Sequence, residues 1–166
     1  MTVKHFDHSR SLTYPGSVPT PHDDEVVIPA LLRAARGSYG DAIRASLASA
    51  GFEDFPRNGA FVVGGMANHG GSASDMIQGL GISKQAASQL IDTLVVRGYL
   101  TREINPEDRR RMVIELTERG RAAAVVVRSA IEGVNRELVE MVSPSELAGL
   151  RAGLAALASI KEIREK

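Results

Sequence analysis

The chain has 166 residues and no cysteine, and its 20 Lys and Arg balance its 20 Asp and Glu. This length suits one domain with a buried core, and the lack of cysteine excludes disulfides, thiolate metal sites and thiol redox sensing. No apolar run approaches the ~18 to 20 residues that cross a bilayer, and the N-terminal MTVKHFDHSR has no signal-peptide core, so we expect a cytoplasmic protein without a membrane partner.

The N-terminal part divides into an arm and a long helix. Residues 1–25 are polar, rich in proline and without periodicity, which predicts a loose arm. The remainder, residues 26–166, is expected to form a single domain. Its apolar residues first recur at helical spacing from about residue 26 to residue 50, which predicts an amphipathic helix that stops near Gly51.

A second helix is predicted near residues 56–68, with Pro56 in its first turn. Three glycines interrupt this segment, at Gly59, Gly64 and Gly65. Glycine is a poor helix former, so the pattern predicts a weak helix.

The stretch SASDMIQGLGISKQAASQLIDTLVVRG predicts two short helices around a glycine turn. Ser72 and Asp75 have capping-box spacing for the first helix, and Ser83 can cap the second. The second helix has one apolar stripe, at Ala87, Leu90, Ile91, Leu94 and Val95. Its other face is small and polar, with Lys84, Gln85, Ser88, Gln89 and Asp92. Such a face can enter a DNA major groove, where glutamines can pair with adenine.

After Gly98 the apolar period changes to two, which predicts strands near residues 100–104 and 112–116 joined by the turn NPEDRRR. Arginines outnumber acidic residues around this turn, at Arg97, Arg102, Arg109, Arg110 and Arg111. Beside a helix-turn-helix, such a tip can neutralise phosphates and insert an arginine into a minor groove. Asp108, two residues before Arg110, can pair with that guanidinium and aim it.

Two long helices are predicted at the C-terminus. Thr117 can cap the first, and Ser143 with Glu146 has capping-box spacing for the second. Their apolar stripes would be exposed in a monomer. We therefore expect residues 26–54 and 118–166 to pair in a homodimer, with residues 55–117 as a winged helix-turn-helix between them.

The segment LGISKQAASQLIDTLVVRGYLTREINPEDRRRMVIELTERG resembles the core of the MarR family of bacterial winged-helix transcription regulators. The likeness rests on the Leu-Gly-Ile-Ser entry, the Leu-Ile-Asp run, the Arg-Gly-Tyr-Leu-Thr-Arg hinge, Asp108-x-Arg110 and the Leu-Thr-Glu-x-Gly end. It is strong over about residues 55–120 and extends weakly to 26–162. The glycines near residues 59–65 depart from the family, which usually has better helix formers there.

The resemblance implies a mainly α fold with a small β-hairpin wing and long N- and C-terminal dimerisation helices. It also implies an obligate homodimer that binds an inverted repeat in double-stranded DNA, usually as a repressor released by a small aromatic ligand. No cofactor or metal is expected.

The DNA-binding residues are carried over position by position. The groove-reading segment is Ser83, Lys84, Gln85, Ala87, Ser88 and Gln89. In the wing, Asp108 would orient Arg110 toward the minor groove. Arg102, Arg109 and Arg111 complete the predicted contacts. Four residues form a candidate ligand pocket, although aromatic residues at such spacing are more often core: Tyr39, Phe55, Phe61 and Met66.

Two other classes of function stay open from the residues alone. The neutral net charge is compatible with a winged helix that docks a protein and never meets DNA. An enzyme is the weakest option, because no nucleophile triad, paired carboxylates or metal-ligand spacing emerges around His69 or elsewhere.

Overall fold

The computed structural model describes residues 27–69, 82–104 and 112–164. Its described elements are, in order, α1 (Ile28–Ser49), α2 (Gly59–His69), α4 (Lys84–Val96), β1 (Leu100–Ile104), β2 (Met112–Leu116), α5 (Glu118–Met141) and α6 (Pro144–Arg164). β1 and β2 pair as an antiparallel hairpin, with Leu100 opposite Leu116 and Ile104 opposite Met112. This mainly helical architecture with one small hairpin confirms the predicted fold class.

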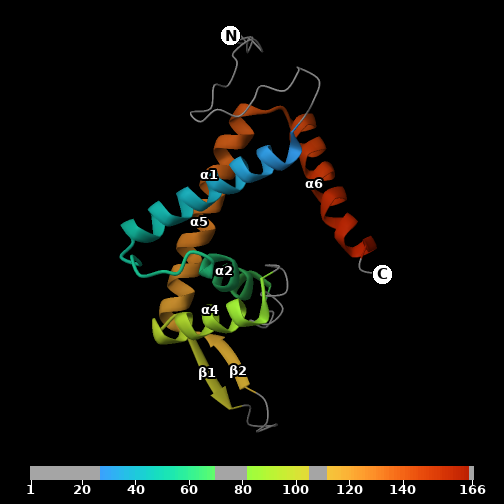
Figure 1. Ribbon diagram of the computed structural model, residues 1–166. Helices are drawn as coiled ribbons and strands as arrows, with labels where there is room; N and C mark the ends of the chain where they lie inside the picture. Colours follow the sequence, from blue (N-terminus) through green and yellow to red (C-terminus); the bar gives the residue numbers. More distant parts are fainter. Residues whose placement is uncertain (1–26, 70–81, 105–111, 165–166) are drawn as a thin grey trace.

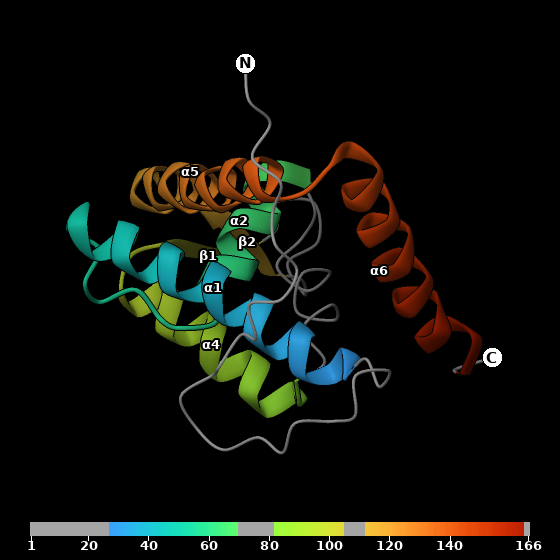
Figure 2. The ribbon, with the colours of Figure 1, turned by 90° about the horizontal axis from the view of Figure 1, so that it is seen from above.

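The long helix α5 is the axis of the molecule (Figure 1). α1 crosses it, α2 and α4 pack beside its N-terminal half, and the hairpin extends from the same end. α6 turns away from the C-terminal end of α5 and stands apart from the body in both ribbon views (Figures 1 and 2). The DNA-reading elements predicted from the sequence therefore lie at one end of α5, and α6 lies at the other.

Local signals explain where most elements begin and end. Thr117 accepts a hydrogen bond on Oγ1 from the Gly120 amide at 2.9 Å, which caps α5. The Ser143 amide donates to Glu146 Oε2 at 2.8 Å, and the Glu146 amide donates to Ser143 Oγ at 3.3 Å. This reciprocal pair is the predicted capping box of α6. α1 ends before Gly51, whose φ of 82° favours glycine.

The start of α2 differs from the sequence prediction. Pro56 lies in a turn before the helix, where its carbonyl accepts from the Gly59 amide at 2.8 Å, and the helix begins at Gly59. A Cβ at Gly59 would lie 2.9 Å from Pro56 Cγ and 3.1 Å from Leu94 Cδ2. Glycine at this position therefore lets α2 approach α4 closely, which offsets its poor helix propensity.

The core lies where α1, α2, α4, the base of the hairpin and α5 meet. It consists of Leu47, Val62, Val63, Met66, Ile91, Leu94, Tyr99, Leu100, Ala123, Ala124 and Val127. It takes in only the C-terminal end of α1 and the N-terminal half of α5. None of the residues described in the outer parts of these helices or in α6 belongs to this buried cluster.

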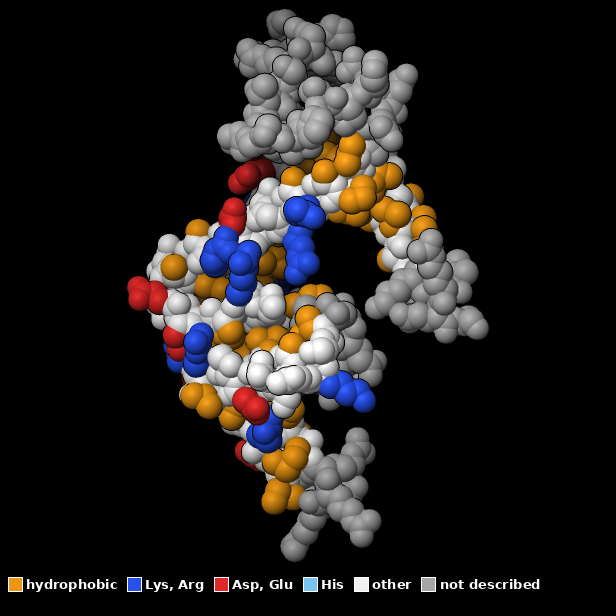
Figure 3. All heavy atoms as spheres, in the orientation of Figure 1, with side chains coloured by type: hydrophobic (Ala, Val, Ile, Leu, Met, Phe, Trp, Pro, Cys, Tyr) orange, Lys and Arg blue, Asp and Glu red, His pale blue; other side chains and the backbone are white. Residues whose placement is uncertain are grey.

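Large apolar side chains are exposed on the parts of the helices that lie outside this core. They lie on α1 (Ile28, Leu31, Leu32), α5 (Val139, Met141) and α6 (Leu150, Leu154, Leu157, Ile160). Figure 3 shows hydrophobic side chains gathered where α1 approaches α6 and along α6. None of the described helices combines the length and apolarity that a membrane crossing requires.

Candidate nucleic-acid interface

Helix α4 divides into a buried face and an exposed polar face. Ser83 caps it, accepting the Ala86 amide on Oγ at 3.2 Å. Ile91 and Leu94 lie in the core. The exposed face is Lys84, Gln85, Ser88, Gln89 and Asp92. Because these positions are three or four apart, they form one continuous stripe of short or flexible polar groups.

Ala87 does not belong to the exposed stripe. Only 7% of its surface is accessible, and its methyl group lies on the same side of α4 as Ile91. The packing of Ala87 against the core leaves its methyl group little surface for a base, and its predicted DNA contact stays a prediction.

The wing is joined to α4 by an ion pair. Arg102 on β1 donates from Nη2 to Asp92 Oδ1 at 2.8 Å, and 38% of the Arg102 side chain remains exposed. Strand alternation places Arg102 on the same face of the hairpin as Leu100, whose side chain is buried. Arg102 thus holds the wing against the polar helix and still presents part of its guanidinium to solvent.

The rest of the predicted wing site, Asp108, Arg109, Arg110 and Arg111, lies outside the described residues. The same holds for Ser72 and Asp75 in the first helix of the predicted helix-turn-helix. Their assigned roles stay predictions. The strands that flank the wing tip are described, and they project away from α2 and α4 (Figure 1).

A polar cluster that the sequence patterns did not reveal supports the C-terminal end of α4. The Tyr99 hydroxyl donates to Asp54 Oδ1 at 2.6 Å, and Arg119 Nη2 donates to the same oxygen at 2.7 Å. Arg119 Nη1 also donates to the Arg97 carbonyl at 2.7 Å, and Arg97 Nη1 donates to the Asp54 carbonyl. Because these partners come from three distant segments, no local spacing could have indicated them.

The charge state of this cluster follows from its contacts. The Tyr99 hydrogen bond, together with the Arg119 charge, lowers the pKa of Asp54 below its usual 3.8. Burial, aided by the hydrogen bond to Asp54, raises the pKa of Tyr99 from 10.0 to about 12. At neutral pH the cluster therefore joins an ionised carboxylate, a neutral phenol and a guanidinium.

The four candidate pocket residues lie in different surroundings in the described part of the chain. Met66 is buried in the core, Phe55 packs edge-on against Tyr99 with ring centroids 4.7 Å apart, and Phe61 is 49% exposed. Tyr39 is half-buried and donates from its hydroxyl to Asn135 Oδ1 at 2.6 Å.

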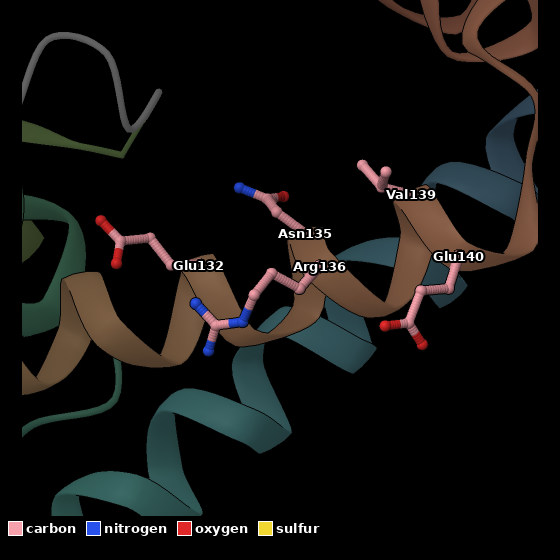
Figure 4. Close-up of a pocket in the computed structure, with 5 residues that line it drawn as sticks. All are labelled: Glu132, Asn135, Arg136, Val139 and Glu140. Atoms are coloured by element: carbon pink, nitrogen blue, oxygen red, sulfur yellow. The ribbon is translucent and has the colours of Figure 1, made fainter.

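A hollow of about 470 Å³ lies beside Asn135, which accepts the hydrogen bond from Tyr39 (Figure 4). Its described lining comes from α5 alone, from Glu132, Asn135, Arg136, Val139 and Glu140. Among the described residues no group of three or more His, Asp or Glu is placed to hold a metal.

Comparison with known proteins agrees with this arrangement. Residues 57–111 match the model of the MarR family. An uncharacterized HTH-type transcriptional regulator of Bacillus subtilis (strain 168), YfiV, is 32% identical over 103 residues. That match covers 60% of this chain and 62% of YfiV, so the chain spans about three fifths of the relative's length.

Solved structures share the fold over most of the chain. The MepR–DNA complex of S. aureus has a TM-score of 0.67 at 20% identity and matches over 81% of this chain and 98% of that chain. Wild-type MarR of E. coli in its apo form has a TM-score of 0.58 at 18% identity, over 81% of this chain and 98% of that one. The chain therefore shares the fold of these regulators over about four fifths of its length, and within it residues 57–111 match the MarR family model.

Proposed function

We propose that this protein is a homodimeric, sequence-specific transcriptional regulator that binds double-stranded DNA. The observation that carries the proposal is the exposed polar stripe of α4, held by Arg102 beside a hairpin whose tip carries three arginines. Related proteins support it, since YfiV is described as a transcriptional regulator and MepR is solved bound to DNA. The proposed activity is non-enzymatic.

In this proposal α4 lies in the major groove. Lys84 at its N-terminal end contacts a phosphate, and Gln85 and Gln89 address base edges. The buried opposite face keeps the helix backbone ordered, so the entropy lost on binding comes mainly from the exposed side chains. Ser88 lies between the glutamines and is small enough for the helix to approach the bases.

The wing reaches the neighbouring minor groove. We propose that Arg110 enters this groove, oriented by Asp108, while Arg109 and Arg111 contact phosphates. Arg102 stays at the base of the wing, where its ion pair with Asp92 fixes the angle between the two reading elements. A minor-groove arginine would favour narrow A·T-rich flanks.

The subunit contact we propose is formed by the terminal helices. Their large apolar residues are exposed in the single chain, including Leu31 at 53% and Leu150 at 45%. A contiguous apolar surface of this kind marks an interface in a protein of ordinary composition. Two-fold pairing there would present the α4 helices to half-sites about 34–36 Å apart, which predicts an inverted-repeat operator.

A small aromatic ligand would relieve repression by binding near α5. The hollow of Figure 4 offers a volume for the ligand. Binding there would change the surroundings of Tyr39, whose hydroxyl donates to Asn135 in the lining. The test is titration with a panel of phenolic compounds while following tyrosine fluorescence. An absence of binding at millimolar concentrations would remove the ligand from the proposal and leave DNA binding untouched.

The function itself is tested by selecting bound duplexes from a random library and sequencing them. We expect an inverted repeat, and the Arg110→Ala variant should bind it more weakly and lose preference for A·T at the flanks. Arg128→Ala is the matched control, since it removes one exposed arginine from the middle of α5. A protein that retains no duplex at low salt would instead be a protein-docking module.

A further inference from the structure

Asp54 joins three parts of the fold that are remote in sequence. It lies in the loop after α1 and binds Tyr99 in the turn after α4 and Arg119 in the first turn of α5, at 2.6 and 2.7 Å. Both donors converge on one oxygen, Oδ1. A single side chain thus ties α1, α4 and α5 together.

The turn after α4 is held tightly within this junction. Tyr99 is 0% exposed, and the Arg119 guanidinium carbon lies 4.5 Å from the centre of its ring. Arg119 also binds the carbonyl of Arg97, the C-cap of α4, at 2.7 Å. The C-terminal end of the groove-reading helix is therefore clamped from the side of α5 and from the loop after α1.

The contacts of Asp54 with Tyr99 and Arg119, here called the clamp, lie between two parts of the molecule. The proposed function assigns different tasks to these two parts. α1 and α5 carry exposed apolar surface for the second subunit, whereas α4 and the hairpin carry the DNA-reading groups. The orientation of α4 relative to α1 and α5 decides how far apart the two reading helices stand in the dimer.

A small change at the clamp has a large effect at the far end of α4. The helix has 13 residues, so its length is about 20 Å at 1.5 Å per residue. A rotation of about 5° at its C-terminal end would move Lys84 by about 2 Å, more than half of the ~3.4 Å rise of one base pair. The two-fold axis would repeat that displacement in the partner.

We infer that Asp54 is a positioning residue for DNA recognition: by clamping the end of α4 to α1 and α5, it sets the separation of the two groove-reading helices. The inference depends on the proposed function, because separation matters only to a dimer that reads two half-sites. Asp54 itself touches no DNA. Its effect is on which operator spacing the dimer accepts.

The test measures binding to duplexes that carry the selected half-sites with the native spacer or with one or two base pairs added or removed. The Asp54→Asn substitution keeps the oxygen that accepts from Tyr99 but removes the charge that holds Arg119. We expect about a tenfold loss at the native spacer, within the range typical of coupling between sites, and a smaller loss at the altered spacers. Binding to random duplex should stay unchanged, because the cationic groups are intact.

Glu53→Gln is the matched control. It removes the same charge from the neighbouring, exposed carboxylate, for which no ion-pair or hydrogen-bond partner occurs in the described part of the chain. This variant should keep the native spacing profile. Tyr99→Phe removes the hydroxyl that donates to Asp54 and should reduce the preference for the native spacer, as Asp54→Asn does. This variant tests the clamp even where Asp54→Asn lowers expression.

The outcomes separate the two proposals. Flattened spacing selectivity with unchanged random-duplex binding supports the positioning role. A native spacing profile in both Asp54→Asn and Tyr99→Phe overturns it, as does a parallel loss of specific binding, random binding and melting temperature. Failure of the unmodified protein to select any half-sites would refute the proposed function instead.

Discussion

The close approach of α5 to the turn after α4 predicts that alanine substitutions at two glycines of α5 change the free energy of unfolding in different directions. A Cβ added at Gly120 would lie 2.1 Å from the carbonyl oxygen of Tyr99 and 3.1 Å from Leu116 Cδ2. A Cβ at Gly133, further along α5, would meet nothing closer than Arg136 Nη2 at 3.9 Å. The same substitution should therefore have opposite signs at the two positions.

The magnitudes follow from helix propensity and from the clash. Alanine is favoured over glycine inside a helix by up to about 1 kcal/mol, so Gly133→Ala should stabilise the protein by about 0.5–1 kcal/mol. At Gly120 the obstacle is a backbone carbonyl in the turn that Asp54 and Arg119 clamp, which cannot rotate away as a side chain would. Overpacking of this kind costs about 1–3 kcal/mol net, and occasionally more.

Thermal and urea unfolding of both variants at one protein concentration would measure this difference, because the stability of the proposed dimer would depend on concentration. For a chain of this size, 1 kcal/mol corresponds to about 2–4 °C in melting temperature. Gly133→Ala should melt slightly above the unmodified protein and Gly120→Ala clearly below it. Equal stability of the two variants would refute the close approach of α5 to the turn after α4.

Four further predictions concern capping, pH and DNA contacts. Replacing Ser83 by Ala should cost about 1 kcal/mol of stability, measured by urea unfolding, because the α4 N-terminus loses its cap, and Ser83→Thr should restore most of it. The pKa of Tyr99 is raised to about 12, so the contribution of this residue to stability is fully present below pH 10 and is lost as pH rises from 10 through 12. Spectrophotometric titration should show one late-titrating tyrosine that is missing in Tyr99→Phe, and its absence from the unmodified protein would contradict the partly buried hydrogen bond to Asp54. The lowered pKa of Asp54 means that the contribution of this carboxylate to stability is present above pH 3.8 and is lost as pH falls below that value. Acid unfolding of Asp54→Asn should therefore lack this part of the pH dependence. Lys84→Glu should weaken binding to all duplexes alike and reduce the salt slope by about one unit, and an unchanged slope would exclude a phosphate contact at this residue.

The features that could be predicted from the sequence depend on neighbours a few residues apart. Ser83, Thr117 and the Ser143–Glu146 pair cap helices as expected, because a cap needs only a side-chain oxygen next to the free amides of the first turn. The hairpin strands followed from a change of period that begins after Gly98. Such signals act locally and survive in any tertiary context.

Other features needed information about packing. Ala87 lies on the helix that carries the exposed polar stripe, but only the packing of α4 against the core decides that its methyl group is buried. Helix α2 begins three residues after Pro56 because Gly59 permits a close approach to α4 that propensity alone would discourage. Burial and steric fit are properties of facing surfaces, which a single segment does not contain.

The sequence by itself determined the helices, their caps, the hairpin, the polar face of α4 and the likeness to MarR regulators. Only the tertiary structure decided that Arg102 pairs with Asp92 and that Asp54 receives Tyr99 and Arg119 on one oxygen. Asp54 and Arg119 are 65 residues apart, and nothing in the spacing of either favours the other. Their contact exists because three helix ends converge on one core, and that convergence is a property of the folded chain.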